Sequence, residues 1–134
     1  MKIGFSTNDI IHWANRYSYP EEDLACNISI RIRNAGFIEK EDFLALCKWK
    51  SPRIMRHCGQ NNADFIREIT RVAFHSESEQ LRIEALTLLN GVSWPTASVL
   101  LHFGHKDPYP IMDFRALWSL GVEEPPHKYT FEFW

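Results

Sequence analysis

The sequence predicts an all-α protein, a multi-helix bundle, and three observations support this fold class. Apolar residues recur at helical spacing through most of the chain. Proline and glycine separate these apolar segments at short intervals, as expected between helices. No region shows the sustained alternation of apolar and polar residues that is typical of half-buried strands. We therefore expect six or seven helices joined by short connections.

Composition limits the classes of protein that need to be considered. The 134 residues are 45% hydrophobic and 24% charged, as in an ordinary soluble globular domain. The net charge of -2 argues against binding to nucleic acid through bulk charge, so a local basic patch would be needed. Three cysteines without a C-x-x-C pair indicate reduced thiols and a cytoplasmic protein. We expect no signal peptide and no membrane-spanning segment.

The first half of the chain predicts three helices, over residues 6–17, 21–35 and 39–50. A Ser6-x-x-Asp9 capping pattern opens the first of them. The third has acids in its first turn and Lys48 and Lys50 in its last, as the helix dipole favours. The apolar side chains expected to face the core from the first two helices are Ile10, Trp13, Ala14, Tyr17, Leu24, Ile28, Ile32 and Ala35.

The second half predicts a helix over residues 63–75 with Phe65, Ile66, Ile69, Val72 and Ala73 on its inner face. A Ser76-x-x-Glu79 capping box opens the next helix. A further helix begins near Pro95, and a short one covers residues 114–120. Only residues 129–134 show any strand propensity.

The stretch from Leu86 to Gly121 is the most informative. Gly91 suits a helix C-terminal stop, because glycine enters the left-handed region freely. Pro95 suits the first turn of the following helix, where a missing N–H costs nothing. Such a corner directs unpaired backbone N–H groups outward, and these groups can bind a phosphate.

This stretch resembles the helix-hairpin-helix DNA glycosylase superfamily, which includes endonuclease III and the alkyladenine glycosylases. The family hairpin typically reads L-P-G-V-G-x-x-T-A and is followed by a catalytic aspartate. Ser93 replaces the second hairpin glycine, and Pro95 replaces the lysine of bifunctional members. The resemblance predicts one domain over residues 1–121, with residues 122–134 as a proline- and aromatic-rich tail that is either the start of a missing C-terminal portion or the end of a shortened relative. The residues that match the family are Leu89, Gly91, Val92, Thr96, Ala97 and Asp113.

The resemblance implies a DNA-binding protein that acts as a monofunctional DNA N-glycosylase. Asp113 would stabilise the oxocarbenium-like sugar, and water would release the base, because Pro95 offers no amine. Trp49 or Tyr109 would stack on a flipped base. The family also implies a monovalent cation at the carbonyls of Leu89, Gly91 and Trp94. No four-cysteine cluster follows Asp113, which excludes the iron–sulphur subgroup. The expected contacts to double-stranded DNA are Gly91, Val92, Ser93, Thr96, Ala97, Lys50 and Arg53.

Simpler interpretations stay open for several of these residues. Asp113 suits a helix N-cap, and Trp49 suits a core position at a dipole-matched helix end. For His102 and His105 we expect capping or solvent contact rather than a zinc site, because no fourth ligand is evident. The alternatives to an enzyme are a non-catalytic DNA-binding module and a bundle that binds a protein partner.

Overall fold

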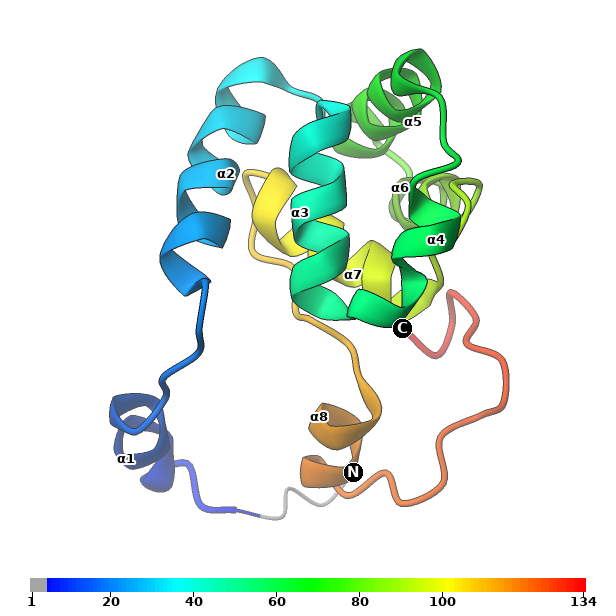
Figure 1. Ribbon diagram of the computed structural model, residues 1–134. Helices are drawn as coiled ribbons and strands as arrows, with labels where there is room; N and C mark the ends of the chain where they lie inside the picture. The colour runs from blue at the N-terminus through cyan, green and yellow to red at the C-terminus, as the bar shows by residue number, and fades with distance from the viewer. Residues whose placement is uncertain (1–4) are drawn as a thin grey trace.

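The computed structural model describes residues 5–134, and all the regular elements in that range are helical (Figure 1). The prediction of an all-α multi-helix bundle is confirmed. The elements are α1 (Asp9–Asn15), α2 (Glu22–Ala35), α3 (Lys40–Lys50), the 3-10 turn η1 (Pro52–Ile54), α4 (Met55–Cys58), α5 (Ala63–His75), α6 (Glu79–Leu86), α7 (Trp94–Gly104) and α8 (Phe114–Ser119).

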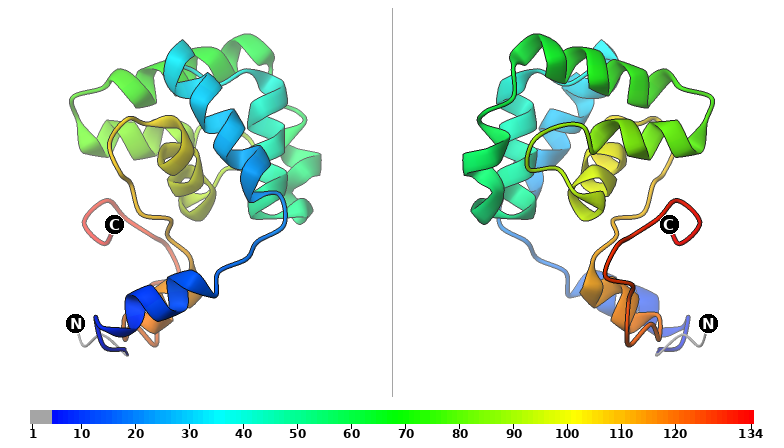
Figure 2. Two further views of the ribbon diagram at one scale, coloured as in Figure 1. Left: turned by 90° about the vertical axis from the view of Figure 1, so that its left-hand side faces the viewer. Right: turned by 90° about the vertical axis from the view of Figure 1, so that its right-hand side faces the viewer.

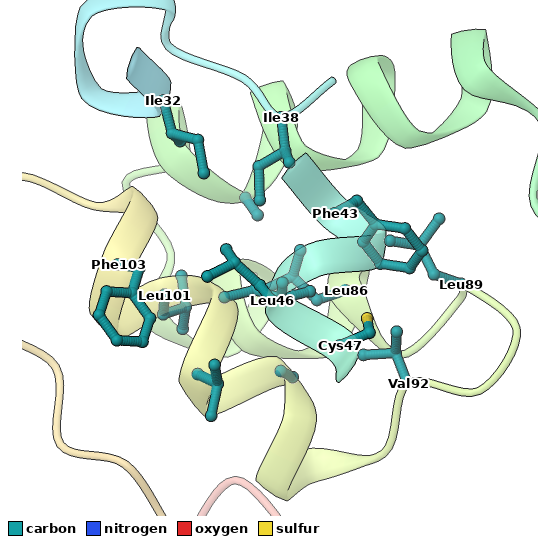
Figure 3. Packing of buried hydrophobic residues seen from close by; sticks show 14 of the residues in the cluster. Ile32, Ile38, Phe43, Leu46, Cys47, Leu86, Leu89, Val92, Leu101 and Phe103 are labelled. Carbon is teal, nitrogen blue, oxygen red and sulfur yellow. The ribbon is translucent and has the colours of Figure 1, made fainter. Parts of the chain in front are cut away.

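Helix α7 forms the centre of the bundle. It is apolar on nearly every side, and a helix with this pattern is stable only when other elements surround it. Contacts with α2, α3, α5 and α6 provide that surrounding. Figure 3 shows Leu101 and Phe103 of α7 near Leu46 of α3, within one continuous cluster of buried side chains. The position of α7 fixes both the corner that precedes it and the loop that follows it.

Helices α1 and α8 lie apart from this core, at the end of the molecule where residues 16–21 and 105–113 lead away from it (Figures 1 and 2). Neither helix packs against another element of the part that the structure describes. The predicted inner face of α1 is therefore wrong, because Ile10, Trp13, Ala14 and Tyr17 are all exposed. An apolar stripe is buried only when a partner covers it.

Two further helices bury a face that is turned slightly from the predicted one. In α2 the buried set is Ala25, Ile28, Ser29 and Ile32, whereas Leu24 and Ala35 are exposed. In α5 it is Ile66, Thr70, Ala73 and Phe74, whereas Phe65 and Val72 are exposed.

Local capping also differs from the sequence prediction. The N-cap of α6 is Ser78, whose hydroxyl accepts from Leu81 N–H at 3.2 Å. Ser76 Oγ instead accepts from Ser78 N–H at 3.1 Å and shapes the preceding turn. The N-cap of α1 is also two residues later than predicted: it is Asn8 instead of Ser6, and Ser6 Oγ accepts from Asn8 N–H. Residues 131–133 form a turn, and residues 129–134 contain no strand. Across residues 5–134, no helix combines the length and apolar character needed to cross a bilayer.

Candidate nucleic-acid interface

The corner between α6 and α7 is a tight turn that depends on glycine. Gly91 has φ +80°, in the left-handed region predicted for it. A Cβ at this position would lie 2.8 Å from Cys58 Sγ and 3.0 Å from Cys58 N. The turn therefore packs directly on α4, and residue 91 has both a conformational and a steric reason to be glycine.

A buried side chain that sequence reasoning missed holds this turn in place. Asn61 is 3% exposed, and its Oδ1 accepts from Asn90 N–H at 2.8 Å. Its Nδ2 donates to Asn90 O and to Cys58 O, both at 2.9 Å. The amide thus mimics a strand partner for Asn90, and it ties the corner to the end of α4. No local pattern predicts this contact, because its two partners lie 29 residues apart.

Four backbone N–H groups of the corner have no acceptor within residues 5–134. Two of the predicted contact residues use their N–H groups internally, because Val92 N donates to Leu89 O and Ala97 N donates to Ser93 O. The Ser93 side chain makes no capping hydrogen bond. Val92, Thr96 and Ala97 are buried, so their side chains contribute packing rather than a contact surface, and of the three only Thr96 has a backbone N–H without an acceptor among the described residues. The N–H groups without an acceptor are those of Gly91, Ser93, Trp94 and Thr96.

The predicted cation site uses carbonyls of the same turn. That of Leu89 already accepts from Val92 N–H at 3.1 Å, and it keeps one lone pair for a ligand. The cation stays a prediction.

Exposed cations lie on the segment that packs against this corner. Gly91 contacts Cys58 and His57 of α4, and α4 directly follows η1, so Arg53 and Arg56 belong to the same edge of the bundle. Both arginines are exposed, and neither forms an ion pair with a described residue. The positions of the acidic residues in the sequence also favour an anion-binding edge here.

The chain carries no Asp or Glu between Asp42 and Asp64, and none between Glu84 and Asp107. These two segments supply η1, α4, the corner and α7. A corner built from acid-free segments that carry Arg53 and Arg56 favours an anionic ligand, although the whole chain is slightly acidic. This gap in the acidic residues is a signal that is visible in the sequence itself.

Asp113 caps a helix and also forms an ion pair. Its Oδ1 accepts from Ala116 N–H at 2.8 Å as the N-cap of α8, and its Oδ2 lies 3.3 Å from Lys50 Nζ. Burial alone would raise the pKa of Asp113, but the bonds from Ala116 and Lys50 outweigh it and lower that pKa. The carboxyl is thus held as an anion, and both of its oxygens have partners.

The loop that carries Asp113 is attached to α7. Ser98 Oγ accepts from Met112 N–H at 2.9 Å and donates to Pro95 O at 2.7 Å. The residue before Asp113 is therefore fixed to the first turns of the helix that follows the corner. The sequence argument found no amine next to Pro95. The structure, however, brings Lys50 to Asp113 from α3, 63 residues away in the chain.

The two residues predicted to stack on a base differ in their surroundings. Trp49 is half-buried, and its ring centroid lies 5.2 Å from those of Tyr19 and Phe103. A base could stack there only after Tyr19 moved away. Tyr109 lies in a polar cluster in which its hydroxyl donates to Glu79 Oε2 and accepts from Arg82 Nη1, both at 2.7 Å.

His102 and His105 take hydrogen-bonding positions. His102 Nδ1 donates to Tyr109 O at 2.7 Å. His105 is 2% exposed, it contacts Arg82 Nη1 through Nε2, and its Nδ1 accepts from Asp107 N–H at 3.0 Å. Within the described residues, no group of three or more His, Cys, Asp or Glu side chains is arranged to hold a metal ion.

Comparison with known proteins adds no relative to this description. No family model matches the chain, and no curated protein or solved structure matches it.

Proposed function

We propose that this protein binds double-stranded DNA through the phosphate backbone, using the α6–α7 corner as a helix-hairpin-helix clamp. The observation that carries the proposal is the set of N–H groups without acceptors at residues 91, 93, 94 and 96, beside the exposed Arg53 and Arg56. The N-terminus of α7 adds the positive end of its dipole at the same corner. A phosphate satisfies both the N–H groups and the local charge.

Such a clamp would contact only backbone atoms of DNA. We therefore expect binding that is weak, sensitive to salt and nearly independent of base sequence. The replacement of the family's second glycine by Ser93 does not remove the clamp, because every residue except proline supplies an N–H. The φ of Ser93 is -96°, so the position needs no glycine.

A second candidate function, base release by Asp113, is supported by the charge state of its carboxyl. Loss of a base from deoxyribose develops positive charge at the sugar, and an adjacent carboxylate stabilises it. A lowered pKa keeps Asp113 ionised, as this role requires. The ion pair with Lys50 would have to open when substrate arrives, because Asp113 otherwise has no unengaged oxygen.

The rival class, a protein-interaction bundle, is favoured by the exposed apolar residues of the two helices outside the core. Ile11 of α1 is 73% exposed, and Trp118 of α8 is 68% exposed. A protein that used these helices would not need the corner to bind DNA.

One pair of substitutions at Ser93 tests the clamp. Ser93→Pro removes an N–H from the corner, whereas Ser93→Ala keeps it and removes a hydroxyl that caps nothing. In fluorescence anisotropy with a labelled duplex at low salt, Ser93→Ala should bind like the parent protein, and Ser93→Pro should bind much more weakly. Circular dichroism checks that both variants are folded. No duplex binding by the parent protein would favour the interaction bundle instead.

A further inference from the structure

Tyr109 is a ring held rigidly in place. Its hydroxyl has two partners, Glu79 and Arg82, and its carbonyl accepts from His102. The Arg82 guanidinium lies 5.7 Å from the ring centroid, and the His105 ring meets it at 5.0 Å and 88°. Burial, followed by the bond to Glu79, raises the pKa of Tyr109 to about 12, so the hydroxyl stays protonated. Such a fixed aromatic surface loses little entropy when it stacks on a ligand.

Trp134 is stacked on this ring. The centroids of Trp134 and Tyr109 lie 5.7 Å apart, with an angle of 7° between the rings. Trp134 also lies 6.5 Å from Trp94, the first residue of α7, and 6.4 Å from Phe131. Figure 1 shows how the chain returns from α8 to bring its last residues back beside the bundle.

The segment that brings Trp134 there is held by its aromatic rings. Among residues 5–134, no hydrogen bond or ion pair joins the segment 123–134 to earlier residues. Its side chains that pack against the core are those of Phe131 and Trp134. The indole Nε1 of Trp134 is buried without an acceptor in the part of the chain that the structure describes, and an unmade hydrogen bond destabilises this position. Trp134 therefore covers Tyr109 without polar contacts that would hold it there.

We propose that the Tyr109 ring is a stacking site for an unpaired nucleobase and that Trp134 occupies this site when no DNA is bound. The inference rests on the proposed function, because Trp94 links the two sites. Its backbone N–H belongs to the clamp, and its ring flanks Trp134. Trp94 thus belongs both to the corner, where a phosphate would bind, and to the surroundings of the indole. A planar base replaces a planar indole with the same kind of contact.

The test compares two tail substitutions on two DNA duplexes. Trp134→Ala uncovers Tyr109, whereas Phe133→Ala removes a tail ring that stacks on Tyr129 and not on Tyr109. For a duplex with one bulged base, Trp134→Ala should raise the affinity at least about five-fold, the lower end for one base–aromatic stack. Its affinity for an intact duplex should not change. Phe133→Ala should leave both affinities unchanged.

Equal affinities of the parent protein and Trp134→Ala for the bulged duplex would overturn the proposal. A gain that persists after Tyr109→Leu is added to Trp134→Ala would also overturn it, whereas Tyr109→Phe, which keeps the ring, should preserve the gain. Titration of deoxyadenosine monophosphate into Trp134→Ala, followed by NMR, tests the site without a duplex. Shifts at Tyr109 and Trp94 without any duplex binding would reject the proposed function but keep the stacking site. If no resonances shift, the stacking site is rejected.

Discussion

Asn61→Ala should both destabilise the protein and weaken DNA binding, whereas the adjacent Asn62→Ala should only destabilise it. The two asparagines are neighbours in sequence, but Asn61 holds the corner and Asn62 caps a helix. Asn61 Oδ1 and Nδ2 make three hydrogen bonds that hold the corner against α4. Asn62 Oδ1 caps α5, accepting from the N–H groups of Asp64 and Phe65.

The magnitudes follow from these contacts. A hydrogen bond contributes about 1 kcal/mol net, so the loss of the three Asn61 bonds should lower the free energy of unfolding by about 2–3 kcal/mol. Loss of an N-cap costs about 1 kcal/mol, which is the expectation for Asn62→Ala. Both losses are smaller than the about 5–15 kcal/mol that usually stabilises a domain, so both variants should fold.

Urea unfolding gives the two free energies, and anisotropy with a labelled duplex at low salt gives the affinities. We expect duplex binding to fall only for Asn61→Ala, because the corner then loses its attachment to α4. Equal destabilisation by the two substitutions would refute the role given to Asn61. Normal duplex binding by a folded Asn61→Ala protein would show that the clamp does not depend on this attachment.

Four more outcomes can be checked. Gly91→Val should abolish duplex binding while circular dichroism shows that the helices persist, because φ is +80° and a Cβ would lie 2.8 Å from Cys58 Sγ; a variant that binds normally would contradict this. Asp113→Asn should keep folding and DNA binding, since its amide oxygen can still cap α8, but should slow any base release by about two powers of ten or more; undiminished release would exclude Asp113 as the catalytic group. Borohydride should trap no covalent protein–DNA adduct, because Pro95 offers no amine at the corner; a trapped adduct would contradict release of the base by water. Burial and then Arg82 lower the pKa of His105 from 6.5, so the unfolded chain binds the proton first. The free energy of unfolding should therefore fall as the pH drops below about 6.5, until the folded-state pKa is reached, and His105→Gln should flatten that slope.

The helical elements could be predicted from the sequence because their signals are local. The predicted helix over residues 63–75 has the bounds of α5, and the turn at Gly91 has the left-handed backbone expected of it. Burial was harder to predict, because it depends on what covers a face. The stripe of α1 has a helical period but no partner, so Ile10 and Trp13 stay exposed.

The contacts of the candidate site were harder to predict from the sequence, because they join segments that are far apart in the chain. Lys50 meets Asp113 across 63 residues, and no spacing rule links them. Arg82 illustrates the same limit, since it is only 8% exposed and contacts Tyr109, which lies 27 residues further along the chain. The tight turn between α6 and α7 could be predicted because Gly91 ends one helix and Pro95 begins the next, an order that is local in the sequence.

The salt dependence of duplex binding tests the phosphate clamp most directly. Each neutralised phosphate contributes about -0.9 to the slope of log K against log salt concentration. If Arg53 and Arg56 each meet a phosphate, the slope should be about -2, and the double substitution Arg53→Gln/Arg56→Gln should bring it close to zero. Arg67→Gln is the matched control, because that arginine is already paired with Glu39 and Asp64. A slope that the double substitution leaves unchanged, or no binding of the parent protein at low salt, would contradict the clamp.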